Sequence, residues 1–298
     1  MIDLHCHILP GIDDGAANLT ASLEMARAFV ADGVSVVACT PHILPGLYNN
    51  TGPEIRMAVT ELQAVIDREE IPLRLVAGAD NHIAPDCVPR LRGETMLVLA
   101  DSRYVLIEPP HHVAPQRLEL AFFELRIAGY VPILTHPERL RWIDSYYAAI
   151  QRLAVAGVWM QITAGSLAGT FGSRARYWAE RMLDERCAHI LATDAHEIKI
   201  RRPDLSRGRD LAARRLGDEE AWHMVFTRPR GVLENVSPMD LPLPSEEISS
   251  TSPQKGDIPF AGALRGIGPS KRLDDASSRH RDDFAGRLRR FFAGSTHL

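Results

Sequence analysis

The chain has few cysteines and no long apolar run. Its four cysteines lie far apart and include no Cys-x-x-Cys pair, which argues against both a disulfide framework and a cysteine-rich structural zinc site. No stretch of apolar residues is long enough to span a membrane. A strand is predicted from the first residue onward, so we expect no signal peptide and a cytoplasmic location.

Two binding signatures are also missing. Residues 1–240 contain no basic stripe interleaved with aromatic side chains, and we therefore expect no nucleic-acid partner. The loop after the first apolar stretch is not a glycine-rich dinucleotide fingerprint, which argues against a dinucleotide-binding sheet. What is present is a chain of 298 residues, 45% of them hydrophobic, which is enough for a large core.

Short β-rich stretches alternate with stretches of helical periodicity. The predicted strands are residues 1–7, 34–40, 74–79, 104–107, 131–135, 158–163 and 189–193. Helices are predicted at about 116–128, 145–156 and 173–185, with two more in the first 70 residues and further helical material at 205–226. Such alternation indicates a parallel α/β sheet, most simply closed into a TIM-like barrel of seven units. An open, doubly wound sheet is the alternative.

Side chains that can bind metals stand at or after nearly every predicted strand. Only the sixth strand, which ends near Thr163, lacks one. The residues concerned are His5, His7, Asp14, His42, Asp80, Glu108, His136, Asp194 and His196. Because the carboxyl ends of barrel strands meet on one face, we expect these side chains to converge there. Imidazole and carboxylate without thiolate suit manganese, zinc or iron, and the ligands are numerous enough for two or three ions.

Two arginines accompany this set. Arg139 follows His136 by three residues, and Arg201 follows His196 by five. The guanidinium group matches the oxygens of a phosphate through paired hydrogen bonds. Several divalent ions together with arginine suit a phosphoryl group better than an amide, because a phosphate and its transition state need positive charge around them.

These residues resemble the polymerase-and-histidinol-phosphatase (PHP) superfamily of metal-dependent phosphoesterases. The match is closest to one branch, the bacterial manganese-dependent tyrosine phosphatases of capsule and exopolysaccharide operons. It rests on His-Cys-His-Ile-Leu-Pro-Gly-Ile-Asp-Asp-Gly at 5–15, Thr-Pro-His at 40–42, Ile-Glu at 107–108, His-Pro-Glu-Arg at 136–139 and Asp-Ala-His at 194–196. The motifs occur in the family order over about residues 1–240. The resemblance implies a distorted (β/α)7 barrel with a trinuclear site.

The resemblance also implies a role for each candidate residue. The first metal would be held by His5, His7 and Asp194, the second by Glu108 and His136, and the third by Asp14, His42 and His196. Asp80 stands where the family has a glutamate that bridges the first two metals, and its side chain is one methylene shorter. Arg139 and Arg201 match the phosphate-binding arginines. The implied metal is Mn²⁺, with Zn²⁺ or Fe²⁺ as alternatives.

The activity that follows from the resemblance is hydrolysis of phosphotyrosine by a metal-activated water. The implied partner is a phosphotyrosine protein, a tyrosine autokinase that regulates polysaccharide synthesis. The thiol-phosphatase signature, a cysteine followed by five residues and an arginine, occurs at none of the four cysteines. Three alternatives stay open: a small-molecule phosphatase acting on histidinol phosphate, a nuclease-like phosphodiesterase, and a binding protein whose turnover is impaired, with Asp80 as its sign.

The composition changes after about residue 237. Residues 1–240 are predicted to form the barrel, and residues 241–298 a Pro/Ser-rich linker followed by a basic, mostly disordered tail. Four apolar residues of the tail would share one side of a basic helix: Phe284, Leu288, Phe291 and Phe292. Such a helix suits a peripheral contact with an anionic membrane surface or with a protein partner.

Overall fold

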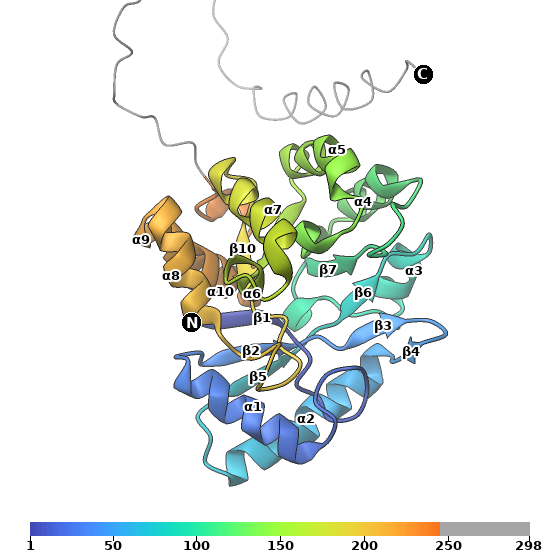
Figure 1. Ribbon diagram of the computed structural model, residues 1–298. Helices are drawn as coiled ribbons and strands as arrows, with labels where there is room; N and C mark the ends of the chain where they lie inside the picture. The colour runs from blue at the N-terminus through green and yellow to red at the C-terminus, as the bar shows by residue number, and fades with distance from the viewer. Residues whose placement is uncertain (245–298) are drawn as a thin grey trace, which may run out of the picture. The chain divides into compact units, whose positions relative to one another are not determined.

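The computed structural model describes residues 1–244 (Figure 1). The strands are β1 (Ile2–Cys6), β2 (Val36–Cys39), β3 (His42–Leu44), β4 (Tyr48–Asn49), β5 (Arg74–Ala77), β6 (Asp80–His82), β7 (Tyr104–Glu108), β8 (Val131–Thr135), β9 (Trp159–Thr163) and β10 (Ile190–Ala192). The predictions for a tail helix and for disorder fall on residues 245–298 and lie outside the described part of the chain.

Helices connect and cover these strands. The longer ones are α1 (Leu19–Ala31), α2 (Gly52–Arg68), α4 (Leu118–Ile127), α5 (Ile143–Val155), α7 (Gly172–Asp184) and α8 (Leu205–Leu216). The shorter ones are α3 (Cys87–Arg92), α6 (Ala164–Leu167), α9 (Asp218–Trp222), α10 (Arg228–Leu233), η1 (Leu99–Asp101), η2 (Pro137–Arg139), η3 (His223–Thr227) and η4 (Pro238–Asp240).

The strands form two sheets that together make a distorted barrel. One sheet has the order β1-β2-β5, and the other has the order β10-β9-β8-β7-β6-β3-β4. All pairs are parallel except the β3–β4 hairpin. A parallel bridge between Cys6 and Ala195 links the end of β1 to the segment after β10. The predicted distorted, TIM-like barrel is therefore confirmed, and the open, doubly wound alternative is wrong.

The second and third predicted strands are shorter than expected, and each is followed closely by a further short strand that was not predicted. β2 covers residues 36–39 of the predicted 34–40, and β3 begins just after Pro41, which has no N–H to donate. β5 ends just before Gly78, where an added Cβ would lie 2.7 Å from Cδ2 of Leu99. Asp80 therefore begins β6 instead of ending the third strand.

The predicted helices are present, with adjusted ends. Asn18 caps α1, because its side chain accepts a hydrogen bond from the amide of Ala21 at 3.0 Å. The helical material predicted at 205–226 is divided at Gly217, whose φ of +87° ends α8 and starts α9. The short helix α6 follows β9 directly and has no signal in the sequence periodicity.

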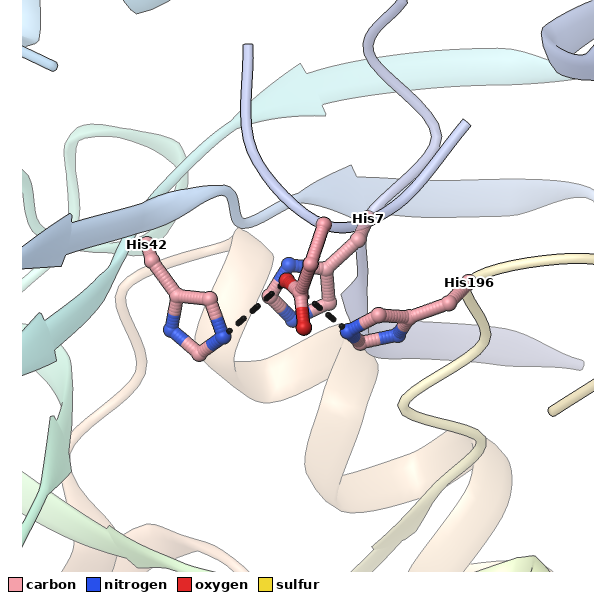
Figure 2. A group of neighbouring side chains, drawn as sticks. His7, His42 and His196 are labelled. Atoms are coloured by element: carbon pink, nitrogen blue, oxygen red, sulfur yellow. Dashed lines mark ion pairs between the residues drawn. The ribbon is translucent and has the colours of Figure 1, made fainter. Parts of the chain in front are cut away.

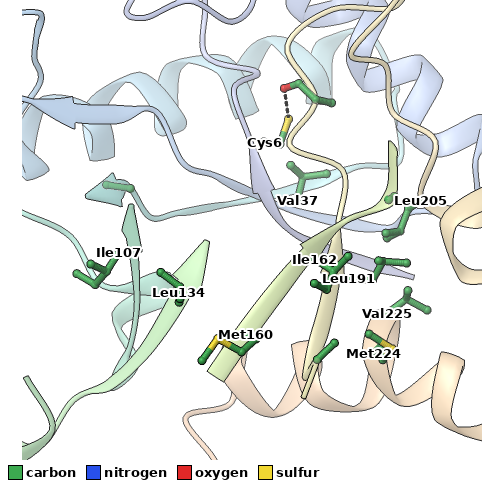
Figure 3. Close-up of a cluster of buried hydrophobic side chains, with 14 of the residues drawn as sticks. Cys6, Val37, Ile107, Leu134, Met160, Ile162, Leu191, Leu205, Met224 and Val225 are labelled. Carbon is green, nitrogen blue, oxygen red and sulfur yellow. Dashed lines mark hydrogen bonds between the residues drawn. The ribbon is translucent and has the colours of Figure 1, made fainter. Parts of the chain in front are cut away.

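The buried apolar side chains form two clusters, one on each face of the strands. The smaller cluster takes Tyr104 and Leu106 from β7, and the larger takes Val105 and Ile107. Consecutive side chains of a strand point to opposite faces, which explains this division. Figure 3 shows part of the larger cluster, with side chains from the strands, such as Ile107 and Leu134, and from the helical segment η3, such as Met224 and Val225. Both faces of the strands are therefore buried, and polar residues such as Glu108 of β7 and Thr135 of β8 stand at the carboxyl ends.

Candidate metal centre

The opening loop folds back onto the end of β1. His5 and His7 bring their Nε2 atoms to within 3.2 Å of each other. The amide of Ala16 donates to the carbonyl of His7 at 3.0 Å. Gly15 is required at this turn, because an added Cβ would lie 2.1 Å from the carbonyl oxygen of His7. The loop thus brings the Asp13-Asp14 pair next to the two imidazoles.

The residues predicted for the first metal lie together. Oδ1 of Asp194 is 3.5 Å from Nε2 of His5 and 3.3 Å from Nε2 of His7. Oδ2 of Asp80 is 3.5 Å from Nε2 of His5. His5, His7 and Asp80 offer donor atoms that all lie within 4.8 Å of one another, a spacing that allows one ion to be shared.

The residues predicted for the second metal also meet, and they have an additional neighbour. Oε1 of Glu108 lies 3.5 Å from Nε2 of His136. Nε2 of His111 lies 3.1 Å from the same oxygen. These three side chains form a group whose donor atoms are within 4.8 Å of one another. His111 is not among the predicted ligands.

The third predicted group is complete in the structure. Oδ1 of Asp14 is 3.5 Å from Nε2 of His42 and 3.3 Å from Nε2 of His196. Figure 2 shows His7, His42 and His196 converging from three segments of the chain, and dashed lines mark the ion pairs of His42 and His196 with the carboxylate of Asp14. His7 joins the group as a fourth potential ligand, with donor atoms within 4.8 Å of the others. All the predicted ligands therefore lie in one connected cluster.

Asp80 lies between the groups and fits a role as a bridging ligand. Its side chain is fully buried, and neither carboxylate oxygen has a hydrogen-bond partner among residues 1–244. Oδ2 lies 3.5 Å from Nδ1 of His42 and 4.0 Å from Nε2 of His136. A buried carboxylate whose oxygens accept no hydrogen bond is costly unless positive charge, such as a bound cation, lies next to it. The residues therefore fit divalent ions, and these orphaned oxygens support that fit.

Two of the imidazoles are held neutral, the state needed for metal binding. Burial, together with the charge of Arg139, keeps the pKa of His136 well below its usual range. Burial and the neighbouring His7 lower the pKa of His196 to about 4. A neutral imidazole has a free lone pair for a cation, so both side chains are ready to act as ligands near neutral pH.

The pKa values of two other imidazoles are raised by the surrounding carboxylates. Burial alone would lower the pKa of His5, but the charges of Asp80 and Asp194 outweigh it and raise that pKa to about 9. Burial is likewise outweighed at His42, where Glu108 and Asp80 raise the pKa to about 10. The centre therefore attracts positive charge strongly, as a site for divalent cations must.

Both predicted phosphate-binding arginines reach the same atom. Nη1 of Arg139 donates to Oδ2 of Asp194, and Nη2 of Arg201 donates to the same oxygen at 2.7 Å. Burial would raise the pKa of Asp194, but the charges of Arg201 and Arg139 hold it well below its usual range. The amide of His196 donates to the carbonyl of Arg201 at 2.8 Å, which folds the intervening loop back on the site.

Two ligand positions have a left-handed backbone. The φ angle is +33° at His136 and +51° at Asp194. Non-glycine residues seldom adopt this region, and such strain tends to occur at functional sites. In both cases the turn follows a buried strand immediately or within two residues, β8 for His136 and β10 for Asp194. The left-handed backbone therefore lies where two strand ends place their candidate ligands.

Sequence reasoning missed several supporting residues. Oε1 of Gln161 in β9 lies 2.7 Å from Nδ1 of His5, so the sixth strand contributes to the site after all. Glu138 is fully buried and accepts hydrogen bonds from Ser166 Oγ at 2.7 Å and Thr163 N at 3.0 Å. A polar residue inside an apolar strand is the signal that marks Gln161. No spacing rule identifies His111, although it follows Glu108 by three residues.

Two cavities border the centre. One, of about 470 Å³, is lined by His111, Arg139, Arg141, Phe171, Arg174 and Ala175. The other, of about 270 Å³, shares Phe171 and is lined by several basic residues that include Lys199, Arg201, Arg202 and Arg207. The guanidinium carbon of Arg139 lies 4.2 Å from the centroid of the Phe171 ring. Both approaches to the centre therefore combine positive charge with an aromatic surface.

Known proteins are similar to this chain in sequence and in fold. The chain is 39% identical over 201 residues to the tyrosine-protein phosphatase YwqE of Bacillus subtilis, covering 67% of this chain and 79% of that protein. It is 27% identical over 244 residues to the tyrosine-protein phosphatase CpsB of Streptococcus pneumoniae, covering 78% of this chain and 98% of that protein.

A solved structure agrees with these relationships. The crystal structures of YwqE and CpsB, described as unique metal-dependent tyrosine phosphatases, include one that matches with a TM-score of 0.77 and 34% identity. That match covers 80% of this chain and 96% of the other. Residues 1–234 match the family described as "Capsular polysaccharide synthesis, CpsB/CapC". The resemblance inferred from the motifs is confirmed, and the chain belongs to the CpsB/CapC family of capsular polysaccharide synthesis proteins.

Proposed function

We propose that this protein is a metal-dependent phosphoric monoester hydrolase that removes phosphate from phosphotyrosine in a protein, with Mn²⁺ as the metal. The observation that carries the proposal is the cluster of histidines and carboxylates around Asp80, next to two arginines that share one oxygen of Asp194. The names of the relatives YwqE and CpsB support the same reaction. A tyrosine autokinase of polysaccharide synthesis is the proposed substrate protein.

The protein's own residues account for binding and orientation of the phosphate. Divalent ions, when bound, would supply Lewis acidity and lower the pKa of a water molecule so that it can attack phosphorus. Arg139 and Arg201 present donors at one edge of the centre, where a phosphate oxygen can take the place of the Asp194 oxygen as acceptor. Their charges offset the negative charge that develops in the transition state.

The imidazole ligands are held in one orientation by buried partners. Gln161 holds His5 through Nδ1, and Asp13 holds His7 through Nδ1 at 2.7 Å. In both residues the Nε2 atom is then the one that faces the centre. Such outer partners fix the tautomer and direction of a ligand and raise its basicity.

The cavities favour an anionic, aromatic substrate over a cationic one. Arginines line both cavities, and the smaller cavity also has Lys199. The acidic residue that lines the smaller cavity is Asp204. Histidinol phosphate carries an ammonium group, which these walls would repel. The partly exposed Phe171, which lines both cavities, instead suits the ring of a phosphotyrosine. This observation ranks a phosphotyrosine protein above the small-molecule alternative.

The test compares the two substrates on the same preparation. Metal-stripped protein is resupplied with manganese or zinc, and phosphate release is measured from a phosphotyrosine peptide and from histidinol phosphate. Manganese-dependent release from the peptide supports the proposal. Preference for histidinol phosphate would assign the protein to the small-molecule branch. If the protein binds metal but hydrolyses neither substrate, the result would support the alternative of a binding protein whose turnover is impaired.

The cytoplasmic location and the contact of the tail with a membrane or partner stay predictions. Within residues 1–244, none of the helices combines the length and apolar character needed to cross a bilayer.

A further inference from the structure

We propose that His111 is a direct ligand of the metal ion held by Glu108 and His136, and that it offsets the short side chain of Asp80. This inference rests on the proposed metal-dependent function and adds a ligand that the motifs do not contain. Nε2 of His111 lies 3.1 Å from Oε1 of Glu108, and His136 reaches the same oxygen at 3.5 Å. The two imidazole rings have centroids 4.9 Å apart.

The donor atoms of this group are close enough to share one ion. Those of Glu108, His111 and His136 all lie within 4.8 Å of one another. Asp80 belongs to two other groups, one with His5 and His7 and one with His42 and Glu108, but not to this one. Its nearest oxygen is 4.0 Å from Nε2 of His136. The third donor around Glu108 and His136 is therefore His111.

Three protein ligands are the usual composition of a catalytic zinc site, and zinc is one of the metals that suit these side chains. Such sites hold the ion with three protein ligands and keep one position open for water or substrate. Without His111, the pair Glu108 and His136 would depend on Asp80, whose side chain is one methylene shorter than the family glutamate. His111, in the segment that follows β7, supplies the third donor.

The backbone around His111 is anchored, so its position does not depend on a free loop. The carbonyl of His111 accepts a hydrogen bond from the amide of Arg141 at 2.9 Å. The carbonyl of Pro110 accepts one from Nε1 of Trp142 at 2.8 Å. Pro109 and Pro110 also restrict the backbone between Glu108 and His111. These contacts hold the imidazole against the centre.

The neighbouring residue provides a matched control. His112 is also a histidine but is exposed, whereas the side chain of His111 keeps 31% of its surface exposed. His111→Ala and His112→Ala remove the same group one residue apart. The melting temperature of each variant in EDTA checks that the metal-free fold is unchanged.

The first measurement is manganese binding without any substrate. The number of bound ions is counted by elemental analysis after desalting, and affinities are titrated against a chelating dye. Loss of a residue that only supports a ligand costs about 10- to 100-fold in metal affinity, so loss of a ligand should cost about 100-fold or more at one site. We expect this loss for His111→Ala and unchanged binding for His112→Ala. Full metal content and unchanged affinities in His111→Ala would overturn the proposal.

The second measurement tests the compensation. Asp80→Glu restores the family side chain, and we expect it to recover most of the affinity that His111→Ala loses. If the double variant binds no better than His111→Ala, the link to Asp80 is wrong. A residue that only pairs with Glu108 would not show this rescue. Since neither measurement involves phosphotyrosine, an enzyme that binds metal through His111 but prefers another substrate would contradict only the proposed function.

Discussion

Asp13 holds His7 in position: Oδ2 of Asp13 lies 2.7 Å from Nδ1 of His7. The same oxygen accepts a hydrogen bond from the amide of His42 at 3.1 Å, and Oδ1 accepts one from the amide of Gly15 at 2.9 Å. Hydrogen bonding and the charge of His7 outweigh burial and lower the pKa of Asp13. One carboxylate thus keeps the Nδ1 proton on His7 and leaves Nε2 free for the centre.

Asp13→Asn should weaken manganese binding without changing the shape of the side chain. The asparagine amide can donate to Nδ1, which favours the tautomer of His7 whose Nε2 carries the proton and cannot bind a metal. We expect a loss of about 10- to 100-fold in metal affinity, measured by titration. The melting temperature in EDTA serves as the control for the fold. Equal affinities in the variant and the unaltered protein would show that the pair does not set the tautomer.

Arg139→Ala should lower kcat/KM for a phosphotyrosine peptide by about 100- to 1,000-fold, because a preorganised donor to the transition state is lost. Arg141→Ala is the matched control, since Arg141 lies two residues away at the larger cavity and is exposed. It should change kcat/KM only a few-fold. Because Arg139 also donates to Asp194, the metal content of both variants must be measured. Normal turnover by fully metallated Arg139→Ala would remove this residue from the phosphate site.

Removal of metal should lower the melting temperature. A ligand at 100 times its Kd stabilises the folded state by about 2.7 kcal/mol, which is roughly 5–10 °C for a domain of this size. We expect manganese to produce such a rise in EDTA-treated protein. Asp14→Asn should reduce the rise, since Asp14 belongs to the group with His7, His42 and His196. An identical rise in Asp14→Asn would exclude this carboxylate as a ligand.

Acid should destabilise the fold through His189. Burial, with a smaller effect of the charge of Arg228, lowers the pKa of His189 from 6.5 to about 3, and its Nδ1 accepts a hydrogen bond from the amide of Met160 at 3.1 Å. Between pH 6.5 and 3 the unfolded chain therefore binds a proton that the folded protein does not. The stabilisation is complete above pH 6.5 and is lost as the pH falls through this window. From pH 7.5 to 4.5 the loss should be about 2–3 kcal/mol.

His189→Asn isolates this contribution, because Oδ1 of asparagine can replace Nδ1 as acceptor. Urea unfolding in EDTA at several pH values should show a shallower fall in the free energy of unfolding for this variant. His112→Asn, at an exposed position, should keep the slope of the unaltered protein. The same slope in all three proteins would contradict the assignment to His189.

Truncation tests the predicted domain boundary at residue 240. Arg228 is fully buried, pairs with Glu220 at 2.8 Å and donates to the carbonyl of Pro242 at 2.5 Å. The hydroxyl of Tyr104 donates to the carbonyl of Val236 at 2.8 Å. A chain ending at residue 244 keeps both contacts and should melt within about 2 °C of the full chain.

A chain ending at residue 233 loses both contacts and leaves buried donors without acceptors. Each such group costs about 1–3 kcal/mol, so we expect the melting temperature to fall by roughly 5 °C or more. Calorimetry of the two truncated proteins beside the full chain checks this expectation. If the chain ending at 244 is already destabilised, residues after 244 contribute to the fold.

The sequence by itself determined the barrel and the edge of it at which the candidate ligands meet. Apolar stretches of strand length alternate with helical periodicity, and parallel strands bring their carboxyl ends to one edge. His5, His42, Glu108 and His136 could therefore be expected to meet, although they are far apart in the chain. Strand periodicity is sufficient to predict this meeting, because each of these residues lies at or just after a buried strand.

Tertiary structure decided what surrounds those ligands. The side chain of Leu99 lies so close to Gly78 that an added Cβ would be 2.7 Å from its Cδ2, and no local pattern reveals that contact. The contacts of Gln161 with His5 and of Arg201 with Asp194 depend on how the chain is packed around the centre. His111 faces Glu108 because the segment 140–142 holds its backbone. Strand periodicity specifies where a strand ends, whereas the orientation of a side chain beyond that end is set by contacts with distant residues.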